Sequence, residues 1–391
     1  MTSVGAAVVR QVVPFNRPGL AGAELEYMRQ SLASGHTSSG GPFSRRAGRL
    51  LAEETGAAEV LLTTSCTSAL ELAAMVLDLQ PGDTVVVPSF TFTTTALAFA
   101  RQGARILFCD IEPDTLGLDT GHLATLLDQT VRAVVPVHYA GVACDVGGLR
   151  AALADRPDVA VVEDNAHGLF GRHRGEPLGS LGRFATLSFH ETKNIVCGEG
   201  GALLINDSAD VDRARVLYDK GTDRQAFFRG QVDKYSWKDV GSSFGLADTL
   251  AAYLYGQLEQ RKAIQAKRRA VFERYQRLLA PHSSELGFRL PVIPDGVESA
   301  YHMFYVLLPD SSTRDRVLEL LRAQRIHPTF HYVPLHSSDA GRRFAARETD
   351  CPVTVDVSDR LVRLPFHNNL TLDEIDRVVA ALLAAVSQSA A

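Results

Sequence analysis

Residues 60–87 read VLLTTSCTSALELAAMVLDLQPGDTVVV, which places a strand, a helix and a second strand in succession. The apolar runs at 60–62 and 84–87 have the length of buried strands, the segment 69–79 has a helical period, and Pro81-Gly82-Asp83 is typical of a turn. The same alternation continues to residue 206. It predicts further strands at 105–109, 132–137, 159–163, 184–189 and 202–205 and helices at 118–127 and 148–154. This pattern favours an α/β fold, in which a mostly parallel sheet carries helices on both faces.

The rest of the chain predicts a second, smaller domain. Residues 219–243 show no clear period, and an irregular stretch of that length is usually functional or an interface arm. A long helical pattern at 247–279 follows it. The remainder contains a strand at 303–308 and helices at 314–324 and 372–386. We therefore predict a large α/β domain over residues 1–250, including an N-terminal arm, and a small α+β domain over residues 251–391.

Composition and charge exclude several classes of protein. Of the 391 residues, 46% are apolar and 22% are charged, which is typical of a folded chain with a large core. The formal charge of -5 provides no basic field for nucleic acid or anionic lipid. No apolar run approaches the roughly 18 residues of a membrane span, and residues 1–11 lack the features of a secretory signal. Five cysteines without a CxxC pair argue against a disulfide framework or structural zinc. We expect a cytoplasmic protein without a membrane or nucleic-acid partner.

Polar side chains follow several of the predicted strands, where ligands of such sheets gather. The segment 63–69, which contains Cys66 and Thr67, joins a strand to a helix and offers hydroxyls and free backbone N–H groups. Such a helix start is a ready phosphate site. The alternative is ordinary capping, because Ser68 and Glu71 have the spacing of a capping box.

Two other strands end in ionisable residues. The strand at 159–163 is followed by Asp164 and, three residues later, His167. Asp164 has a simpler alternative role as a helix cap. The strand at 184–189 leads to Lys193, which stands shortly before a glycine-rich stretch. A partly buried lysine there would have the lowered pKa that a Schiff base requires, whereas a solvated lysine is the alternative.

Metal binding is not expected. His190 and Glu191 have a spacing that could suggest a pair of metal ligands, but HExxH is absent and no third ligand is near.

The combined features match the needs of a pyridoxal phosphate (PLP) enzyme. A helix-start anion site, an acid at one strand end and a lysine at the next would hold the phosphate, the pyridine nitrogen and the aldehyde of that cofactor. Phe92 follows the strand at 84–87 and could stack on the ring. In the second domain His331, Tyr332 and His336 flank a proline, although such residues are also common in plain turns.

These residues resemble the DegT/DnrJ/EryC1/StrS family of sugar aminotransferases, PLP-dependent enzymes of fold type I. The resemblance extends from Pro14 to the last helix. Its motifs are Ser34-Gly35 with Gly40-Gly41, Pro81-Gly82-Asp83, Pro88-Ser89-Phe90-Thr91-Phe92, Val137-His138-Tyr139-Ala140-Gly141, Glu163-Asp164, Lys193-Asn194 with Gly198-Glu199-Gly200-Gly201, and His331-Tyr332-Val333-Pro334-Leu335-His336. Residues 188–194 and 227–235 resemble the branch that aminates dTDP-4-keto-6-deoxy-D-glucose at C4.

The resemblance implies roles for single residues. Lys193 would hold PLP as an imine, Asp164 would face the pyridine nitrogen, Phe92 would stack on the ring and His167 would lie near its face. The cofactor phosphate would be bound by residues that match the family's phosphate positions, namely Cys66, Thr67 and Ser188, together with Ser243 from a partner subunit. Ser243 stands where many members have Asn in a Gly-x-Asn-x-Arg motif, and Gly245 replaces the Arg.

The resemblance also implies substrates and partners. L-glutamate would donate the amino group, pyridoxamine phosphate (PMP) would carry it, and a dTDP-4-amino-4,6-dideoxyhexose of gluco or galacto configuration would form. A homodimer with shared active sites is expected, with the irregular arm across the twofold axis. The arm's cations would bind the nucleotide diphosphate, unless they only solvate the surface: they are Lys220, Arg224, Arg229 and Lys234. His331, Tyr332 and His336 would close the sugar side.

Three alternatives stay open. One is amination of another nucleotide sugar, such as a 3-keto sugar or a GDP- or UDP-linked one. A second is a sugar dehydratase of the same fold, although those relatives replace the lysine by histidine and Lys193 is present. The third is a PLP-binding sensor without turnover, for which the sequence offers no DNA-binding module.

Overall fold

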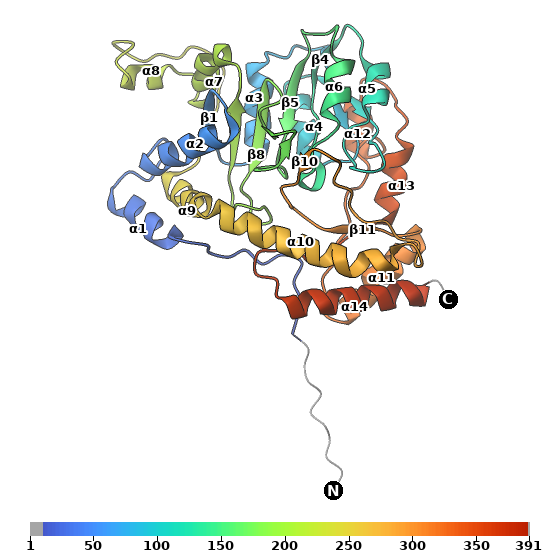
Figure 1. Cartoon of the computed structure of the whole chain (residues 1–391). Coiled ribbons are helices and arrows are strands. Elements are labelled where there is room, and N and C mark those ends of the chain that lie inside the picture. Colours follow the sequence, from blue (N-terminus) through green and yellow to red (C-terminus); the bar gives the residue numbers. More distant parts are fainter. Residues whose placement is uncertain (1–10, 390–391) are drawn as a thin grey trace.

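A computed structural model of the protein describes residues 11–389, and helices and strands alternate over the first half of the chain (Figure 1). The strands are β1 (Glu59–Thr63), β2 (Thr84–Pro88), β3 (Arg105–Cys109), β4 (Val131–Val134), β5 (Ala160–Asp164), β6 (Arg172–His173), β7 (Glu176–Pro177), β8 (Phe184–Ser188), β9 (Gly201–Ile205), β10 (Val297–Glu298), β11 (Tyr305–Leu307) and β12 (Leu361–Arg363).

The helices vary from short turns to the long α10, which crosses the molecule in Figure 1. They are α1 (Glu24–Ala33), α2 (Pro42–Thr55), α3 (Cys66–Val76), α4 (Thr93–Ala100), α5 (Thr120–Leu126), α6 (Val146–Ala152), α7 (Val211–Tyr218), α8 (Arg224–Phe228), α9 (Asp248–Glu259), α10 (Arg261–Ser283), α11 (Ser311–Ala323), α12 (Asp339–Phe344), α13 (Pro352–Arg360) and α14 (Leu372–Ser389), with the 3-10 turns η1 (Tyr139–Gly141) and η2 (Ser208–Asp210).

A seven-stranded sheet forms the centre of the molecule, in the order β1-β9-β8-β5-β4-β2-β3. The pairs from β8 to β3 are parallel, and only β9 runs antiparallel to its neighbours β1 and β8. This confirms the predicted α/β fold with a mostly parallel sheet. Each predicted strand up to residue 206 is present. The strand expected at 132–137 ends earlier, at Val134, shortly before Pro136, which has no N–H for the ladder.

Helices cover both faces of this sheet. Because side chains alternate across a strand, Val85 and Val87 of β2 pack on one face with α3, α4 and α7, whereas Val86 packs on the other face with α5 and α6. Near β1, β8 and β9 that second face is covered by α2 and α9. Fully buried strands of this kind are nearly continuous apolar runs, which is why the sequence reveals them.

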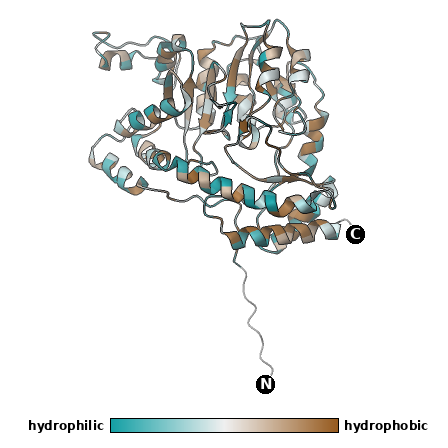
Figure 2. Cartoon of the chain, in the orientation of Figure 1, coloured by the Kyte–Doolittle hydropathy of each residue, from teal (hydrophilic) through white to brown (hydrophobic). Residues whose placement is uncertain are grey.

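The C-terminal elements form a core of their own. The helix predicted at 247–279 is two helices, α9 and α10, separated at Gln260. α10 leads from the sheet to a cluster with β11, α11 and α14, and Val13 from the start of the chain joins this cluster. In Figure 2, α14 is drawn largely in hydrophobic colours, while α10 carries many hydrophilic positions. The predicted domain boundary at residue 250 falls inside α9, and the division remains a prediction.

The irregular segment 219–243 contains one short helix, α8, and extends from the body of the molecule beside α7 (Figure 1). No helix within residues 11–389 combines the length and the apolar character needed to cross a membrane.

Candidate active site

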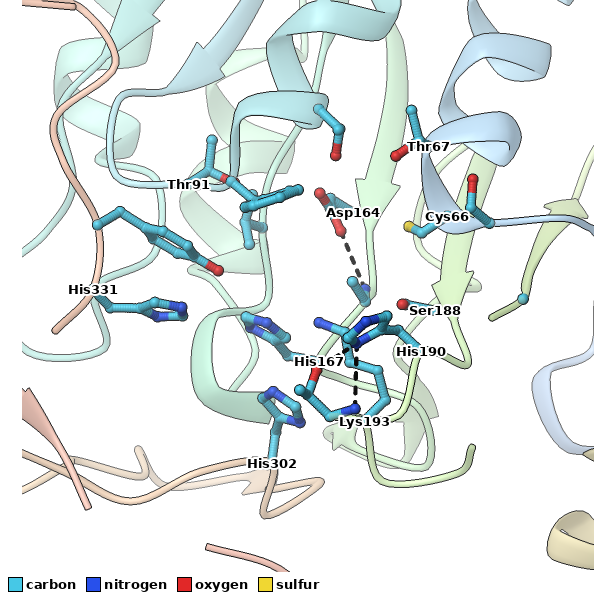
Figure 3. A pocket seen from close by; sticks show the side chains of 18 of the residues that line it. Cys66, Thr67, Thr91, Asp164, His167, Ser188, His190, Lys193, His302 and His331 are labelled. Atoms are coloured by element: carbon cyan, nitrogen blue, oxygen red, sulfur yellow. Dashed lines mark hydrogen bonds between the residues drawn. The ribbon is translucent and has the colours of Figure 1, made fainter. Parts of the chain in front are cut away.

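A cavity of about 420 Å³ opens at the carboxyl ends of β1, β5 and β8. Figure 3 shows Cys66 and Thr67 on one side of it, His331 on the other, and Asp164, His167 and Lys193 between them. The sequence-predicted residues that line the cavity come from four strand ends and the C-terminal part: Cys66, Thr67, Phe92, Asp164, His167, Ser188, Lys193, His331 and Tyr332. These residues lie close together because the carboxyl ends of parallel strands lie at the same edge of a sheet.

One wall of the cavity is the first turn of α3. Cys66 and Thr67 are its first two residues, whose N–H groups have no acceptor within the helix. The helix is capped by Ser65, whose Oγ accepts from Ser68 N–H at 3.0 Å, so the predicted capping box of Ser68 with Glu71 is wrong. Glu71 instead pairs with Arg101. Burial, followed by the charge of Asp164, raises the pKa of the Cys66 thiol to about 12, so Cys66 offers a neutral thiol and a backbone N–H.

Asp164 ends β5 with its carboxylate at the cavity. It is 6% exposed, and its Oδ2 accepts from Thr95 Oγ1 at 2.7 Å while Oδ1 accepts from Ala166 N–H at 3.2 Å. Among residues 11–389 no cationic side chain forms an ion pair with it, which leaves a buried carboxylate without a counter-ion. The neighbouring Glu163 turns away and accepts from His138 Nε2 at 2.8 Å.

Lys193 lies in the loop that follows β8, and its N–H donates to His190 O at 2.9 Å. Burial lowers the pKa of its amine from 10.5 to about 8, although the nearby Cys66 and Asp164 act in the opposite direction. A neutral amine is therefore available near physiological pH, which is what a nucleophilic or proton-transferring lysine needs.

Three imidazoles form the floor of the cavity beside Lys193. His167 stacks on His302 with ring centroids 4.1 Å apart, and His331 lies 6.4 Å from His167. Burial, together with the charge of Lys193, holds the pKa of His167 well below its usual range. His167 Nδ1 is buried and has no hydrogen-bond partner among the described residues.

Phe92 is the N-cap residue of α4 and is 56% exposed. Phe92 lines the cavity, where its exposed ring is available to a ligand. Ser188, the last residue of β8, pairs in register with Gly201 of β9 and lines the cavity together with Cys66 and Thr67.

His336 lies outside the cavity lining. Its Nδ1 is 2.6 Å from Ser89 Oγ, and its backbone N–H donates to the same hydroxyl at 3.1 Å. These bonds hold the segment before α12 to the end of β2. A role for His336 on the sugar side remains a prediction.

The predicted residues of the arm also lie outside this cavity. Ser243 forms an isolated antiparallel bridge with Asp219, and Lys220 Nζ pairs with Asp219 Oδ1 at 2.9 Å. Arg224 pairs with the same carboxylate, and Arg229 Nε donates to Gln231 Oε1 at 3.0 Å. Since the resemblance assigns the arm to a partner's site, their contact with substrate or cofactor phosphate remains a prediction.

Several residues of the site were not identified from sequence, above all Arg363 and His302, which line the cavity, and Thr95, which bonds Asp164. Arg363 interrupts the apolar run Leu361 to Phe366, and this single charge is the signal that could have revealed it. Thr95 and His302 carry no such signal, because a threonine within a helix and a histidine before a strand are common in any fold. Asn194, beside Lys193, accepts through Oδ1 from His302 Nδ1–H at 2.9 Å.

The described residues contain no group of three or more His, Cys, Asp or Glu side chains placed to hold a metal ion. His190 Nε2 is 3.6 Å from Glu199 Oε1 rather than paired with Glu191.

Comparison with known proteins identifies relatives of the whole chain. The chain is 30% identical over 379 residues to the spore coat polysaccharide biosynthesis protein SpsC of Bacillus subtilis. The match covers 95% of this chain and 96% of SpsC. The structure matches the aminotransferase TlmJ from Streptoalloteichus hindustanus with a TM-score of 0.89 and 30% identity, over 97% of this chain and 100% of TlmJ.

A third match shows likeness of fold. Spr1654 from Streptococcus pneumoniae, whose structure is known in a PLP-form, gives a TM-score of 0.89 at 24% identity, over 97% of this chain and 100% of Spr1654. The fold is thus that of fold type I PLP-dependent aminotransferases, as the resemblance implied. The model of one family matches residues 19–383, nearly the whole chain. The protein belongs to the DegT/DnrJ/EryC1/StrS aminotransferase family.

Proposed function

We propose that the protein is a PLP-dependent aminotransferase that moves the amino group of L-glutamate to C4 of dTDP-4-keto-6-deoxy-D-glucose, giving a dTDP-4-amino-4,6-dideoxyhexose and 2-oxoglutarate. One observation carries the proposal: Lys193, with its pKa lowered to about 8, lines the same cavity as the buried carboxylate of Asp164. Membership in a family of aminotransferases supports it, and the sequence likeness of residues 188–194 and 227–235 favours the C4 branch.

The residues of the cavity fit PLP. A phosphate needs several N–H and hydroxyl donors, which the first turn of α3 and Ser188 offer. A protonated pyridine nitrogen needs a buried carboxylate without a counter-ion, which describes Asp164. The cofactor, when bound, withdraws electrons from the α-carbon of an attached amine so that its proton can be moved.

Each residue then has a limited task. Lys193 holds the cofactor covalently, and once released its neutral amine takes a proton from the donor's α-carbon and later delivers one to C4 of the sugar. Asp164 keeps a positive charge on the ring nitrogen. Phe92 covers one face of the ring, and Tyr332 with His331 excludes water from the side of the C-terminal elements.

The oligomer completes the site. We place the arm 219–243 of one subunit over the cavity of its partner in a homodimer, where Ser243 adds a donor to the cofactor phosphate. Lys220 and Arg229 face the diphosphate of the nucleotide. Asp219 Oδ1 already pairs with Lys220 Nζ at 2.9 Å, so the positive charge of Lys220 is partly compensated before any diphosphate binds.

The test is to incubate the purified protein with PLP, L-glutamate and dTDP-4-keto-6-deoxy-D-glucose and to identify the product by mass spectrometry and NMR. We expect an amino sugar with nitrogen at C4, and the H3–H4 coupling distinguishes gluco from galacto. Lys193→Ala is the matched control and should form none.

Other results separate the alternatives. Conversion of PLP to PMP by L-glutamate without amination of this sugar would contradict the proposed identity of the acceptor. It would indicate that the acceptor is another nucleotide sugar. Loss of a sugar hydroxyl without net amination would indicate a dehydratase. No spectral change with L-glutamate would leave a protein that binds PLP without turnover.

A further inference from the structure

We propose that His302 determines specificity in the sugar half-reaction: its Nε2, kept free of a proton by Asn194, accepts a hydrogen bond from the hydroxyl next to the keto carbon of the sugar. The inference deepens the proposed function and rests on it. His302 lines the cavity and lies beside His167 and Lys193 (Figure 3). Neither His302 nor Asn194 was assigned a role from the sequence.

The first argument is the tautomer of His302, which follows from the amide of Asn194. Asn194 Nδ2 donates to Ala300 O at 2.6 Å, and a carbonyl oxygen can only accept, so the orientation of the amide is fixed. Its Oδ1 therefore faces His302 Nδ1 at 2.9 Å, and an amide oxygen also only accepts. His302 Nδ1 thus carries the proton, and Nε2 presents a lone pair.

The second argument is that this lone pair is available to a ligand. Burial, followed by the neighbouring His167 and Lys193, holds the pKa of His302 well below its usual range, so the ring is neutral. Its Nε2 has no hydrogen-bond partner among residues 11–389, yet it is not one of the polar atoms sealed away from any partner, as His167 Nδ1 is. Because His302 lines the cavity, Nε2 is an acceptor open to a ligand there.

The third argument is that the ring is held in place from several sides. It stacks on His167 with ring centroids 4.1 Å apart and planes 12° apart. Its backbone N–H donates to Ala140 O at 3.1 Å, and its carbonyl accepts from Arg268 Nη2 at 2.5 Å. The preceding Tyr301 has a left-handed φ of 50°, a conformation that such fixed surroundings maintain. An acceptor fixed in this way selects a ligand by the place of its donor.

The chemistry of the acceptor selects the group that it binds. Carboxylates and phosphates offer acceptors, so an unprotonated imidazole nitrogen disfavours both ends of L-glutamate and the diphosphate of the nucleotide. A sugar hydroxyl can donate. Of the two carbons beside C4 in dTDP-4-keto-6-deoxy-D-glucose, C3 carries a hydroxyl and C5 does not. Since C4 must reach Lys193, the C3 hydroxyl is the donor next to the reacting carbon, and His302 is the acceptor beside Lys193.

The rival donor is the amine of Lys193 itself. Lys193 acts in both half-reactions, whereas the sugar takes part only in the second. Loss of the His302 acceptor would therefore slow both half-reactions if it served the lysine, and only the second if it served the sugar.

The test uses His302→Phe in the PLP-loaded protein, because phenylalanine keeps a ring for the stack on His167 but has no nitrogen. His282→Phe is the control, since His282 is exposed near the end of α10 and lies outside the cavity lining. The two half-reactions are followed separately by cofactor absorbance. The first uses L-glutamate, and the second starts from the amino form with the keto sugar or its 3-deoxy counterpart.

We expect the unaltered protein and His282→Phe to use the keto sugar with a kcat/KM about tenfold above that for the 3-deoxy sugar, which corresponds to one well-formed neutral hydrogen bond. His302→Phe should use both sugars equally, and its kcat/KM for L-glutamate should change less than about threefold. A His302→Phe protein that still prefers the 3-hydroxyl would overturn the proposal. An equal loss in both half-reactions would also overturn it and make His302 a partner of Lys193.

The tautomer is measured without turnover. In protein labelled with ¹⁵N-histidine, the ring signals of His302 are those that disappear in His302→Phe. The proposal requires a protonated Nδ1 and an unprotonated Nε2 at neutral pH, and a loss of this preference in Asn194→Leu, whose folding circular dichroism checks. A proton on Nε2 of the unaltered protein would overturn it.

A binding measurement separates this inference from the proposed reaction. The probes are dTDP-6-deoxy-D-glucose, which has no keto group to aminate, and its 3-deoxy counterpart, titrated into the PMP-loaded protein by calorimetry. If a preference for the 3-hydroxyl depends on His302 while no sugar is aminated, the contact stands and the proposed amino transfer fails. If amination at C4 proceeds without this preference, the contact is wrong and the function stands.

Discussion

At the scale of single residues, the buried carboxylate of Asp164 has one hydroxyl donor, Thr95, which itself lies 2.9 Å from Thr91 Oγ1. We predict that Asp164→Asn, which keeps the shape of the side chain but removes its charge, lowers amino transfer by roughly 10³-fold. Thr95→Ala should lower it by about tenfold, because it leaves the Asp164 carboxylate short of one donor. Single-turnover kinetics with L-glutamate measure both.

The matched control is Thr95→Ser, which retains the hydroxyl and should keep most of the rate. If Thr95→Ser and Thr95→Ala are equally slow, the effect comes from packing rather than from the bond to Asp164, and the account of this residue is wrong.

The lysine supplies a prediction about pH. Burial lowers the pKa of Lys193 from 10.5 to about 8, so the amine is neutral, and reactive, above pH 8. At pH 7 it should react with an amine-directed reagent such as trinitrobenzenesulfonate about 300-fold faster than an ordinary lysine, given the same intrinsic reactivity. The experiment labels cofactor-free protein across pH 6–11 and counts modified peptides by mass spectrometry. A midpoint for Lys193 near 10.5, the value of an ordinary lysine, would show that its amine is not buried as described.

Sequence reasoning identified the cavity residues that directly follow strands of the sheet and, through the resemblance, His331 and Tyr332, but it missed others from the C-terminal elements. Asp164 and Lys193 stand at or just after the ends of apolar strands, and the carboxyl ends of parallel strands lie at one edge of a sheet. Arg363 and His302 come from the C-terminal elements. Their approach to Lys193 depends on how these elements dock on the sheet, which no local pattern encodes.

At the scale of elements, the approach of β9 to the first turn of α3 requires a residue without a side chain. A Cβ at Gly201 would collide with backbone atoms of Ser65 and Cys66. We predict that Gly201→Ala shifts the first turn of α3 and weakens the retention of PLP by at least about tenfold, because the donors at a helix start act only at hydrogen-bond distance. Equilibrium dialysis against PLP measures the loss.

Gly147→Ala is a suitable control for this change. Gly147 lies in α6, away from the cavity lining, and a Cβ there would meet Asp145 Oδ1 at an ordinary 3.6 Å. PLP retention that is unchanged in Gly201→Ala would mean that the first turn of α3 does not hold the phosphate.

Element boundaries show where local signals are ambiguous. The continuous helical period of 247–279 conceals the break at Gln260, because no proline or glycine marks it. Likewise Ser65 and Ser68 are both good capping residues, and only the structure identifies Ser65 as the cap. In contrast, the strands of the sheet are recognised readily, since their burial on both faces leaves little choice of residue.

At the scale of the whole molecule, the arm 219–243 exposes aromatic side chains that a monomer would leave in water. Trp237 is 81% exposed and Phe228 is 72% exposed. If the arm lies across the interface of the proposed homodimer, the double substitution Phe228→Glu and Trp237→Glu shifts the protein to monomer and lowers amino transfer, because burying a charge at an apolar interface is costly. Sedimentation velocity and activity are measured on the same samples.

Leu372→Glu serves as the control, since Leu372 is 63% exposed at the start of α14, far along the chain from the arm. Should the double variant remain a dimer with full activity, the arm would not lie across the subunit interface.

The fold class could be predicted from the sequence, but the contacts between segments far apart in the chain could not. Alternating strands and helices up to residue 206 sufficed for the α/β sheet, and the resemblance identified the family. The joining of Val13 to the C-terminal cluster was not foreseen, because a contact between the two ends of a chain has no signature in either end.

The covalent attachment of PLP to Lys193 is the central claim, and borohydride reduction tests it most directly. The PLP-loaded protein is reduced, digested and mapped by mass spectrometry, with Lys193→Ala treated in parallel. The account predicts a pyridoxyl group on the peptide that contains Lys193 and none on the corresponding peptide of the variant. A pyridoxyl group on another lysine, with Lys193 unmodified, would contradict it.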